Sequence, residues 1–351
     1  MLERLDANPL LTPDDLAPTR DDLEVLCTLN PGAVRRAGET LLLVRVGERA
    51  APRAGYVRYV YFDAEDGETK VAAIAEDDPD LEITDARGYY LRGRMLLTSL
   101  SHLRIARSTD GRNFRFDDAP AIYPATPYEA YGCEDPRITF IDGRYYITYT
   151  AVSDRGVTVA LAETTDFVTF RRHGVIFPPY QKDVCLFPEK VRGMYVCRHR
   201  PYKSEFNAAS IWTAYSPDLH CWGRHERTLA PMPDTWEGER VGCGAPPVRT
   251  DEGWLEIYHA ADAGGKYHLG AMLSDLEHPE RILTRGGTPV LQPEAGYEQK
   301  GVYGNCVFSN GLVVDEDGTM TVYYGAADRI CAAAVTTVPE MVAAAKNAAG
   351  A

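Results

Sequence analysis

Residues 131–150 read YGCEDPRITFIDGRYYITYT and join a charged turn to a typical β-strand. Within this stretch, Gly143–Thr150 places a glycine before a run of aromatic and β-branched residues, a composition that favours a strand. The carboxylates of Glu134–Asp135 stand just before Pro136, which fixes its own φ and biases the preceding aspartate away from the helical region. Burying such charges is costly unless they are paired or used. The stretch alone also fits an ordinary turn with a surface carboxylate–arginine pair, so the rest of the chain decides.

The glycine-plus-strand pattern recurs along the chain and predicts the fold. It begins at Gly38, Gly93, Gly143, Gly193, Gly253 and Gly318. A second pattern, a strand that ends in an aspartate turn, has its aspartate at Asp63, Asp110, Asp166, Asp218 and Asp275. The aspartates recur about every fifty residues, the period of a β-propeller with one four-stranded blade per repeat. We therefore predict an all-β, five-bladed β-propeller. A sandwich of separate domains is the alternative, and the sixth glycine strand either closes the ring or forms a sixth blade.

Both ends of the chain differ from the repeat in composition. Residues 1–29 are rich in proline and aspartate and predict a short N-terminal extension. Residues 30–338 form the predicted propeller, which is the expected catalytic domain. Residues 339–351 begin with proline and continue with many alanines, which predicts a C-terminal helical tail.

Composition and charge exclude several classes of protein. The formal net charge of −14 leaves no basic excess for a general nucleic-acid binder. No apolar run approaches the roughly 20 residues that span a bilayer, and the first residues lack a signal-peptide pattern. The eight cysteines are scattered, without a C-x-x-C pair or a histidine cluster at zinc spacing. We expect a cytoplasmic protein with reduced thiols, no metal site, and neither a nucleic-acid nor a membrane partner.

Three basic sites lie beside apolar strands or glycine–proline turns, where a surface charge is less expected. They are Lys182, the run Arg198–Arg200, and Arg240. In a propeller, strand ends from several blades converge on a central channel, so these groups predict one anion site in an otherwise acidic protein. Arginine suits phosphate through its planar donor fork, and lysine suits it as a point charge. Separate ion pairs on the surface are the alternative.

Aromatic residues near polar turns are candidates for stacking on sugar rings, although each is also explained by strand packing. They are Tyr131, Tyr202, Trp212, Tyr258 and Tyr267. Asp262 and Asp328 end two similar strands, in the segments YHAAD and YGAAD. Their carboxylates either accept hydrogen bonds from sugar hydroxyls or cap the turns.

Residues 132–139, GCEDPRIT, resemble the signature of glycoside hydrolase family 130, the β-mannoside phosphorylases and related mannosidases. The resemblance extends in order over most of the chain. Further matching stretches are NPGAV (30–34), SHLRIARS (101–108), LFPEK (186–190), HRP (199–201), GAPP (244–247), VFSNG (307–311) and YGAAD (324–328). The resemblance implies a five-bladed propeller, which agrees with the five aspartate turns.

The resemblance also implies an inverting glycoside phosphorylase. In the family, the aspartate of the D-P-R motif is the general acid, and the matching residue is Asp135. Inorganic phosphate is the implied co-substrate. It attacks C1 of a β-linked mannose and releases α-mannose 1-phosphate, the proton passes through the mannose 3-hydroxyl, and no cofactor is implied. The positions that match the family's phosphate-binding residues are Lys182, Arg200 and Arg240. The implied substrates are β-1,2- or β-1,4-linked manno-oligosaccharides or mannosyl-glucose.

The same resemblance implies a set of residues that contact the sugar or line the pocket. They are Ser101, His102, Arg104, Glu134, Arg137, Tyr267 and Asp328. Glu134 has a second interpretation, in which it holds Arg137 or Asp135 in place.

Two other functions remain as alternatives. The hydrolytic branch of the family loses the basic set and uses carboxylates that activate water. Here Lys182 stands where some members carry arginine, and Glu237 and Glu239 flank Arg240. The other alternative is a non-catalytic sugar-binding propeller. The sequence leaves open the linkage, the acceptor sugar and whether the chain forms a homo-oligomer.

Overall fold

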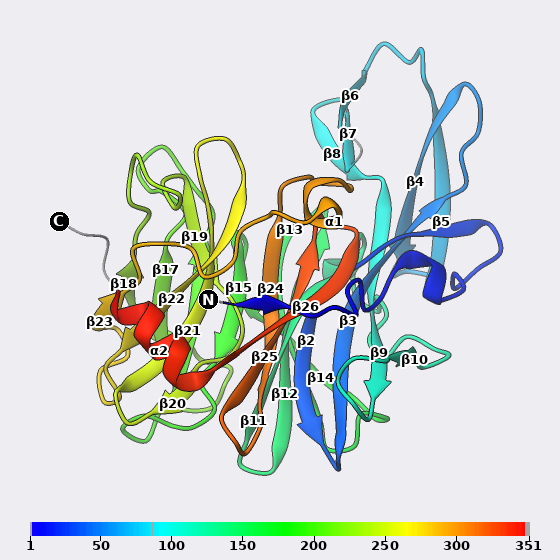
Figure 1. Ribbon diagram of the computed structural model, residues 1–351. Helices are drawn as coiled ribbons and strands as arrows, with labels where there is room; N and C mark the ends of the chain where they lie inside the picture. The colour runs from blue at the N-terminus through cyan, green and yellow to red at the C-terminus, as the bar shows by residue number, and fades with distance from the viewer. Residues whose placement is uncertain (1, 86, 348–351) are drawn as a thin grey trace.

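The computed structural model describes residues 2–85 and 87–347, and almost all of its regular structure is β-strand (Figure 1). Within those residues, the helical segments are α1 (Gly296–Gln299), α2 (Val338–Lys346) and the 3-10 turns η1 (Pro13–Asp15) and η2 (Pro127–Glu129). The prediction of an all-β fold is confirmed. No helix in the described part of the chain has the length and apolar content needed to cross a membrane.

The largest sheet has eight strands in two antiparallel parts. One part contains β2 (Leu23–Arg36), β3 (Glu39–Ala50), β9 (Ser99–Ser108) and β10 (Arg115–Phe116). The other contains β11 (Gly132–Ile141), β12 (Arg144–Ser153), β13 (Gly156–Thr164) and β14 (Arg171–Phe177). A parallel pair between Gly132 and Ser101 joins the two parts. Gly132 has a φ of +128°, and a Cβ there would lie 2.5 Å from the Ser101 backbone, so this close approach requires glycine.

Three further antiparallel sheets follow along the chain. The first contains β15 (Gln181–Leu186), β16 (Tyr195–Pro201), β17 (Ile211–Ser216) and β18 (Gly223–Leu229). The second contains β19 (Arg240–Cys243), β20 (Val248–Thr250), β21 (Gly253–Ala261), β22 (Tyr267–Ser274) and β23 (Ile282–Arg285). The third contains β24 (Val307–Val314), β25 (Thr319–Ala326), β26 (Ile330–Thr337) and, at its edge, β1 (Glu3–Arg4).

Two small sheets form an insertion between β3 and β9, which projects at the upper right of Figure 1. The insertion contains β4 (Tyr56–Asp63), β5 (Glu68–Ala75), β6 (Leu81–Asp85), β7 (Gly88–Leu91) and β8 (Arg94–Leu97). Two of the predicted repeat positions, Asp63 and Gly93, fall here and not in the large sheets, so their assignment to the repeat was wrong. A glycine turn before an apolar strand is frequent in β-hairpins of any kind, so the local pattern does not distinguish an inserted hairpin from a strand of a large sheet.

The other four predicted aspartate turns share one hydrogen-bond pattern. In each, a carboxylate oxygen accepts hydrogen bonds from the backbone N–H groups two and three residues later, at Asp110, Asp166, Asp218 and Asp275. Such local bonds are why aspartate is favoured in turns. The turns follow β9, β13, β17 and β22, so the sequence repeat marks equivalent places in successive groups of strands.

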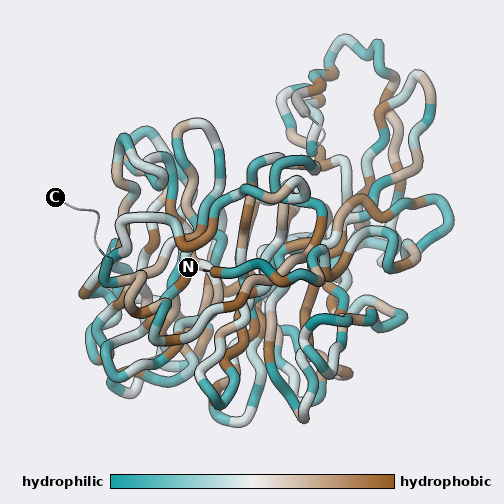
Figure 2. The backbone as a smooth tube through the Cα atoms, viewed as in Figure 1, coloured by the Kyte–Doolittle hydropathy of each residue, from teal (hydrophilic) through white to brown (hydrophobic). Residues whose placement is uncertain are grey.

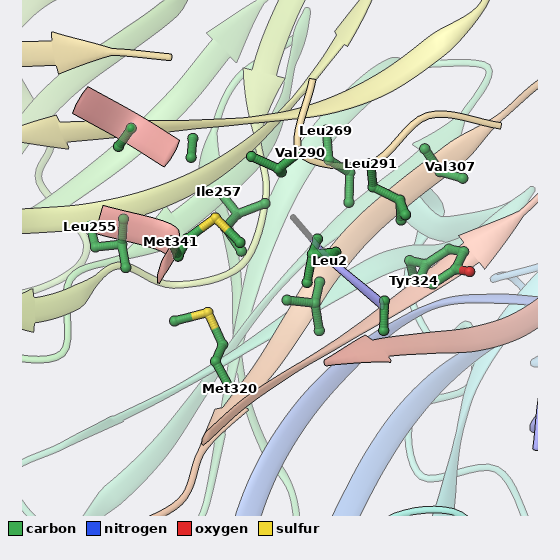
Figure 3. Close-up of a cluster of buried hydrophobic side chains, with 14 of the residues drawn as sticks. Leu2, Leu255, Ile257, Leu269, Val290, Leu291, Val307, Met320, Tyr324 and Met341 are labelled. Carbon is green, nitrogen blue, oxygen red and sulfur yellow. The ribbon is translucent and has the colours of Figure 1, made fainter. Parts of the chain in front are cut away.

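The two ends of the described chain meet in one sheet. Glu3 in β1 pairs with Val335 in β26, and β2 begins at Leu23, so the predicted extension 1–29 contributes to two sheets. Leu2 packs into a buried cluster with Met320, Tyr324 and Met341 (Figure 3). Figure 2 shows where hydrophobic and hydrophilic residues lie along the backbone: many strand segments inside the molecule are hydrophobic, and many of the outer turns are hydrophilic.

The predicted C-terminal helix is present as α2. The side chain of Thr337 accepts a hydrogen bond from the backbone N–H of Glu340, which caps the first turn. The helix begins at Val338 and ends at Lys346. Residues 348–351 of the predicted tail lie outside the described residues.

Candidate active site

A cavity of about 1200 Å³ opens where the first strands of the large sheets come together. Its wall combines charged, amide and aromatic side chains from sequence-distant strands. Those that matter for the chemistry are Asn30, Arg45, Glu134, Asp135, Lys182, Arg200, Arg240, Tyr267 and Asp328. Such convergent polar groups in one concave site mark the expected place for a ligand.

Three of the strands at this site carry a β-bulge with an aspartate or asparagine in the left-handed region. Asp135 has a φ of +51° at the bulge of β11, Asn30 has +49° at that of β2, and Asp183 has +55° at that of β15. Asparagine and aspartate tolerate this conformation better than other side chains, and bulges redirect side chains next to functional sites. Asp135 therefore lies outside the right-handed helical region, but in the left-handed region and not in the extended one that a following proline favours.

The carboxylate of Asp135 has two different oxygens. Its Oδ1 accepts hydrogen bonds from Asn30 Nδ2 at 2.8 Å and from Arg45 Nη1 at 3.1 Å. Its Oδ2 accepts no hydrogen bond from any residue that the structure describes. Arg45 Nη2 also donates to Glu134 Oε1 at 2.8 Å. One guanidinium thus holds both carboxylates and leaves one oxygen of Asp135 available.

These contacts set the protonation of the carboxylates. Burial raises the pKa of Asp135, but Arg45, Lys182 and the hydrogen bond from Asn30 outweigh burial, so its pKa lies below the usual range. Burial raises the pKa of Glu134 despite the opposing charge of Arg45. Burial also raises the pKa of Asp328 to about 6, against Arg45 and with the negative charge of Asp135 adding to the effect. The cavity therefore contains carboxylates with different affinities for a proton.

The three predicted phosphate-binding residues all line this cavity. Arg200 donates from Nε to Asp183 Oδ2 at 2.6 Å, and Arg240 donates from Nη1 to the hydroxyl of Tyr267 at 3.1 Å. Burial lowers the pKa of Lys182, but nearby Tyr202, Asp183 and Asp135 outweigh it and raise the pKa, so the ammonium stays charged. The arrangement places two guanidinium groups and an ammonium around one space.

The predicted sugar-contacting residues divide into two groups. Glu134, Tyr267 and Asp328 line the cavity. The others, Ser101, His102, Arg104 and Arg137, do not form part of its wall.

Three of the residues away from the cavity make other contacts. Ser101 Oγ accepts a hydrogen bond from Arg45 Nε at 3.1 Å, so it supports the cavity from behind. His102 Nε2 lies 3.5 Å from Glu48, and Arg104 lines a separate, smaller hollow. Successive side chains of a strand point to opposite faces, and His102 and Arg104 share the face of β9 that Ser101 does not. Sugar contact by His102 and Arg104 is therefore not supported by the geometry.

Arg137 is almost fully buried and is not part of the cavity wall. Its guanidinium donates to the backbone oxygens of Gly244 at 2.9 Å and Cys243 at 2.8 Å. Its Nη2 also donates to Asp183 Oδ1 at 3.3 Å, and its Nη1 donates to the backbone oxygen of Asp135 at 3.2 Å. All these bonds are internal, so Arg137 supports the cavity and does not line it.

Several candidate residues from the sequence have structural partners. Three of the aromatic candidates, Tyr131, Tyr202 and Tyr267, line the cavity, whereas Trp212 does not. Tyr258 is buried, and its hydroxyl donates a hydrogen bond to Glu237 Oε2 at 2.7 Å.

The carboxylates considered from the sequence also have partners. Glu237 is paired with Arg285 and lies away from the cavity. Glu239 lines the cavity but pairs with Lys203 at 2.8 Å. Asp262 caps its own turn through the backbone N–H groups of residues 264 and 266.

Three residues at the site were not singled out from the sequence. Arg45 lies in the apolar strand LLLVRVG, where the criterion applied to the other basic residues could have found it. Asn30 and Asp183 stand in the stretches NPGAV and KDVCLFP. Their importance depends on bulges and on contacts between distant strands, which local patterns do not report.

Comparison with known proteins agrees with this geometry. The family model described as beta-1,4-mannooligosaccharide phosphorylase, for glycoside hydrolase family 130, matches residues 87–347. The chain belongs to glycoside hydrolase family 130. Among curated members of family 130, the beta-1,2-mannobiose phosphorylase of Listeria innocua is 39% identical over 344 residues, which cover 97% of each chain. The 1,2-beta-oligomannan phosphorylase of Thermoanaerobacter is 43% identical over 69% of this chain and 80% of that protein.

A solved structure from the same family has the same fold throughout. It is the Listeria innocua beta-1,2-mannobiose phosphorylase in complex with beta-1,2-mannobiose, with a TM-score of 0.94 and 38% sequence identity. The match covers 98% of this chain and 99% of that chain. Family 130 membership therefore rests on both sequence and structure.

Proposed function

We propose that this protein is an inverting β-mannoside phosphorylase that uses inorganic phosphate to cleave a β-linked mannoside. The observation that carries the proposal is the set of three cations, Lys182, Arg200 and Arg240, that share one cavity with Asp135. Two guanidinium forks and an ammonium suit a phosphate dianion. The curated relatives named above are themselves mannoside phosphorylases, which supports the same conclusion.

In the proposed reaction, a phosphate oxygen forms a bond to C1 of mannose while the bond from C1 to the glycosidic oxygen breaks. The leaving oxygen keeps the electron pair and gains the proton held on Asp135, relayed through the mannose 3-hydroxyl as the family implies. Phosphate is its own nucleophile, so the step needs neither a second catalytic carboxylate nor a cofactor. The products are α-mannose 1-phosphate and the shortened sugar.

The low pKa of Asp135 fits this order of events. Without ligand, Arg45 and Lys182 favour its ionised form. A bound phosphate brings negative charge close to Asp135, and like charge raises the pKa of a carboxyl group. Phosphate binding therefore favours the protonated acid that the leaving group requires.

The structure supports phosphorolysis over hydrolysis at the two carboxylates that the sequence left open. Glu237 is bonded to Tyr258 and Arg285 away from the cavity, and Glu239 is paired with Lys203. Neither is a free base beside Asp135. We favour a β-1,2-linked substrate, because two curated relatives that are 39% and 43% identical to this chain carry that linkage in their names.

We further propose that the strand groups are the blades of a five-bladed propeller around the cavity. The two parts of the largest sheet and the three further sheets supply the five groups. A cytoplasmic location is also a proposal, supported by the eight cysteines, all of them free.

The deciding experiment incubates the protein with β-1,2-mannobiose, β-1,4-mannobiose or mannosyl-glucose, with and without phosphate. We expect phosphate-dependent release of α-mannose 1-phosphate, fastest with the β-1,2 linkage. Release of free mannose at a rate independent of phosphate would show a hydrolase. Binding of the sugars without turnover would show a sugar-binding protein.

A further inference from the structure

Beneath the three cations lies a buried carboxylate that the proposed reaction does not use. Asp183 is completely buried at the bulge of β15, next to Lys182. Its Oδ2 accepts the hydrogen bond from Arg200 Nε at 2.6 Å, and its Oδ1 accepts one from Arg137 Nη2 at 3.3 Å. His259 Nε2 lies 3.3 Å from Oδ2. A buried charge with this many partners is costly to build and needs an explanation.

The contact with Arg200 leaves the phosphate-facing end of that residue unoccupied. Only Nε of Arg200 is bonded to Asp183, and neither terminal nitrogen donates a hydrogen bond to any residue that the structure describes. Arg200 nevertheless lines the cavity. Because a guanidinium is planar, fixing its Nε edge also fixes the direction of the terminal nitrogens.

The same carboxylate is linked to the strand of the general acid. Arg137 donates a hydrogen bond to Asp183, and its Nη1 also donates one to the backbone oxygen of Asp135 at 3.2 Å. Asp183 thus connects the bulge that presents Asp135 to the arginine that faces the anion space.

Gly242 and His259 pack closely around the carboxylate of Asp183. A Cβ at Gly242 would lie 2.8 Å from Asp183 Oδ2 and 2.2 Å from His259 Nε2, so a larger residue would displace both. Burial lowers the pKa of His259 to about 4, so the imidazole beside Asp183 is neutral near pH 7. The cations that offset the charge of Asp183 are therefore Arg200 and Arg137, which donate hydrogen bonds to it, and the neighbouring Lys182.

We propose that Asp183 is a positioning residue that orients the guanidinium of Arg200 to receive phosphate and holds it in register with Asp135. This inference rests on the proposed phosphorolysis. Asp183 does not touch the substrate; it acts through Arg200. Because the guanidinium of Arg200 is already oriented before phosphate binds, less conformational entropy is lost on binding.

The test is Asp183→Asn, which keeps the shape of the side chain and tolerates the left-handed backbone but removes the charge. We expect the KM for phosphate to rise about tenfold or more, as for the loss of a charge-assisted hydrogen bond. We expect the KM for the mannoside to change by less than about twofold, since the sugar is held by other residues. An unchanged KM for phosphate in a folded variant would overturn the proposal.

The matched control is Glu256→Gln. Glu256 is also buried and also pairs with an arginine of β16, Arg198, but it does not line the cavity. We expect this variant to lose thermal stability and to keep the wild-type KM for phosphate. Equal increases in the KM for phosphate in both variants would show a general loss of structure and would contradict the positioning role.

Two further variants keep the proposal testable if Asp183→Asn does not fold. Arg200→Lys keeps the cation but removes the Nε donor that Asp183 holds, and we expect the KM for phosphate to rise. An unaltered KM would contradict the proposal. In an Arg200→Ala background, adding Asp183→Asn should raise the KM for phosphate no further, because the two residues act as a unit. Absence of phosphorolysis in the wild type would instead refute the proposed function itself.

Discussion

Nη1 of Arg45 donates a 3.1 Å hydrogen bond to Oδ1 of Asp135. Together with the bond from Asn30, this contact occupies one oxygen of the carboxylate and leaves Oδ2 as the oxygen that can hold a transferable proton. Arg45 also pairs with Glu134, so a single cation offsets two adjacent buried negative charges. The geometry and the charge of the acid therefore depend on a residue that lies on another strand.

Replacing Arg45 is expected to destabilise the fold and raise the pKa of Asp135. Arg45→Gln leaves two buried carboxylates without their cation, which typically costs about 3 kcal/mol. Arg45 lowers the pKa of both Asp135 and Glu134, so in the variant both pKa values rise and the two buried carboxylates become protonated as pH falls. Their uncompensated charge then disappears at low pH, and urea unfolding should show a larger loss near pH 7 than near pH 4.

A second variant on the same strand provides the comparison for Arg45. Arg49 pairs with Glu24 at the surface, where an ion pair contributes about 0 to 1 kcal/mol. Arg49→Gln should change the free energy of unfolding little at either pH. Equal losses in the two variants would contradict a special role for the buried pair.

Asp135→Asn should abolish turnover without unfolding the protein. Asparagine tolerates the positive φ at this bulge and keeps a similar shape, but it cannot transfer a proton. Loss of a general acid commonly costs about 10² to 10⁴ in kcat, measured here by release of mannose 1-phosphate. A thermal melt checks the fold, and near-wild-type kcat in the variant would reject Asp135 as the acid.

Removing charge from the other two cations should weaken phosphate binding in both directions of the reaction. Lys182→Gln and Arg240→Gln should each raise the KM for phosphate, and for mannose 1-phosphate in synthesis, by about tenfold or more. Lys190→Gln, which removes a surface partner of Asp142, serves as the control and should leave both constants unchanged. A rise in the KM for the mannoside alone would place these residues at the sugar instead.

Asp328→Asn should make the protein more stable at neutral pH while it impairs sugar binding. Burial raises the folded pKa of Asp328 to about 6, so the ionised group opposes folding once pH rises above the unfolded value and through the folded one. The variant avoids this cost, and we expect a gain on the order of 1 to 2 kcal/mol at pH 7.5. The gain should disappear near pH 4, where the native carboxyl is protonated.

The activity of the same variant separates function from stability. If Asp328 accepts hydrogen bonds from the sugar, the KM for the mannoside should rise and the dependence of kcat/KM on pH between about 5 and 7 should flatten. Wild-type kinetics in a stabilised variant would show that Asp328 is not at the sugar.

Local sequence predicted the strand content, but not all of the contacts around Asp135. The aspartate turns at Asp110 and Asp166 were recognisable because their hydrogen bonds join residues only two or three apart. Asp135 was singled out because it lies in a D-P-R motif that resembles the signature of family 130. Gly93 was misassigned because an inserted hairpin has the same local pattern as a sheet strand.

The other differences concern contacts between strands distant in sequence. His102 was assigned to the sugar because it lies in a matching motif, and the structure places its Nε2 3.5 Å from Glu48 and outside the cavity wall. Asp183 was overlooked because its partners, Arg137 and Arg200, come from two other strands. Which face of a strand meets the cavity depends on the packing of whole sheets, and a local pattern carries no information about it.

The pairing of β1 with β26 has a consequence for biosynthesis. Glu3 and Val335 are hydrogen-bonded neighbours in one sheet, although more than 300 residues separate them along the chain. During translation, residues 2–4 are made long before residues 330–337, which form their partner strand. The sheet therefore reaches its full width only after residues 330–337 have left the ribosome, and this long-range pairing is expected to be a late and slow event.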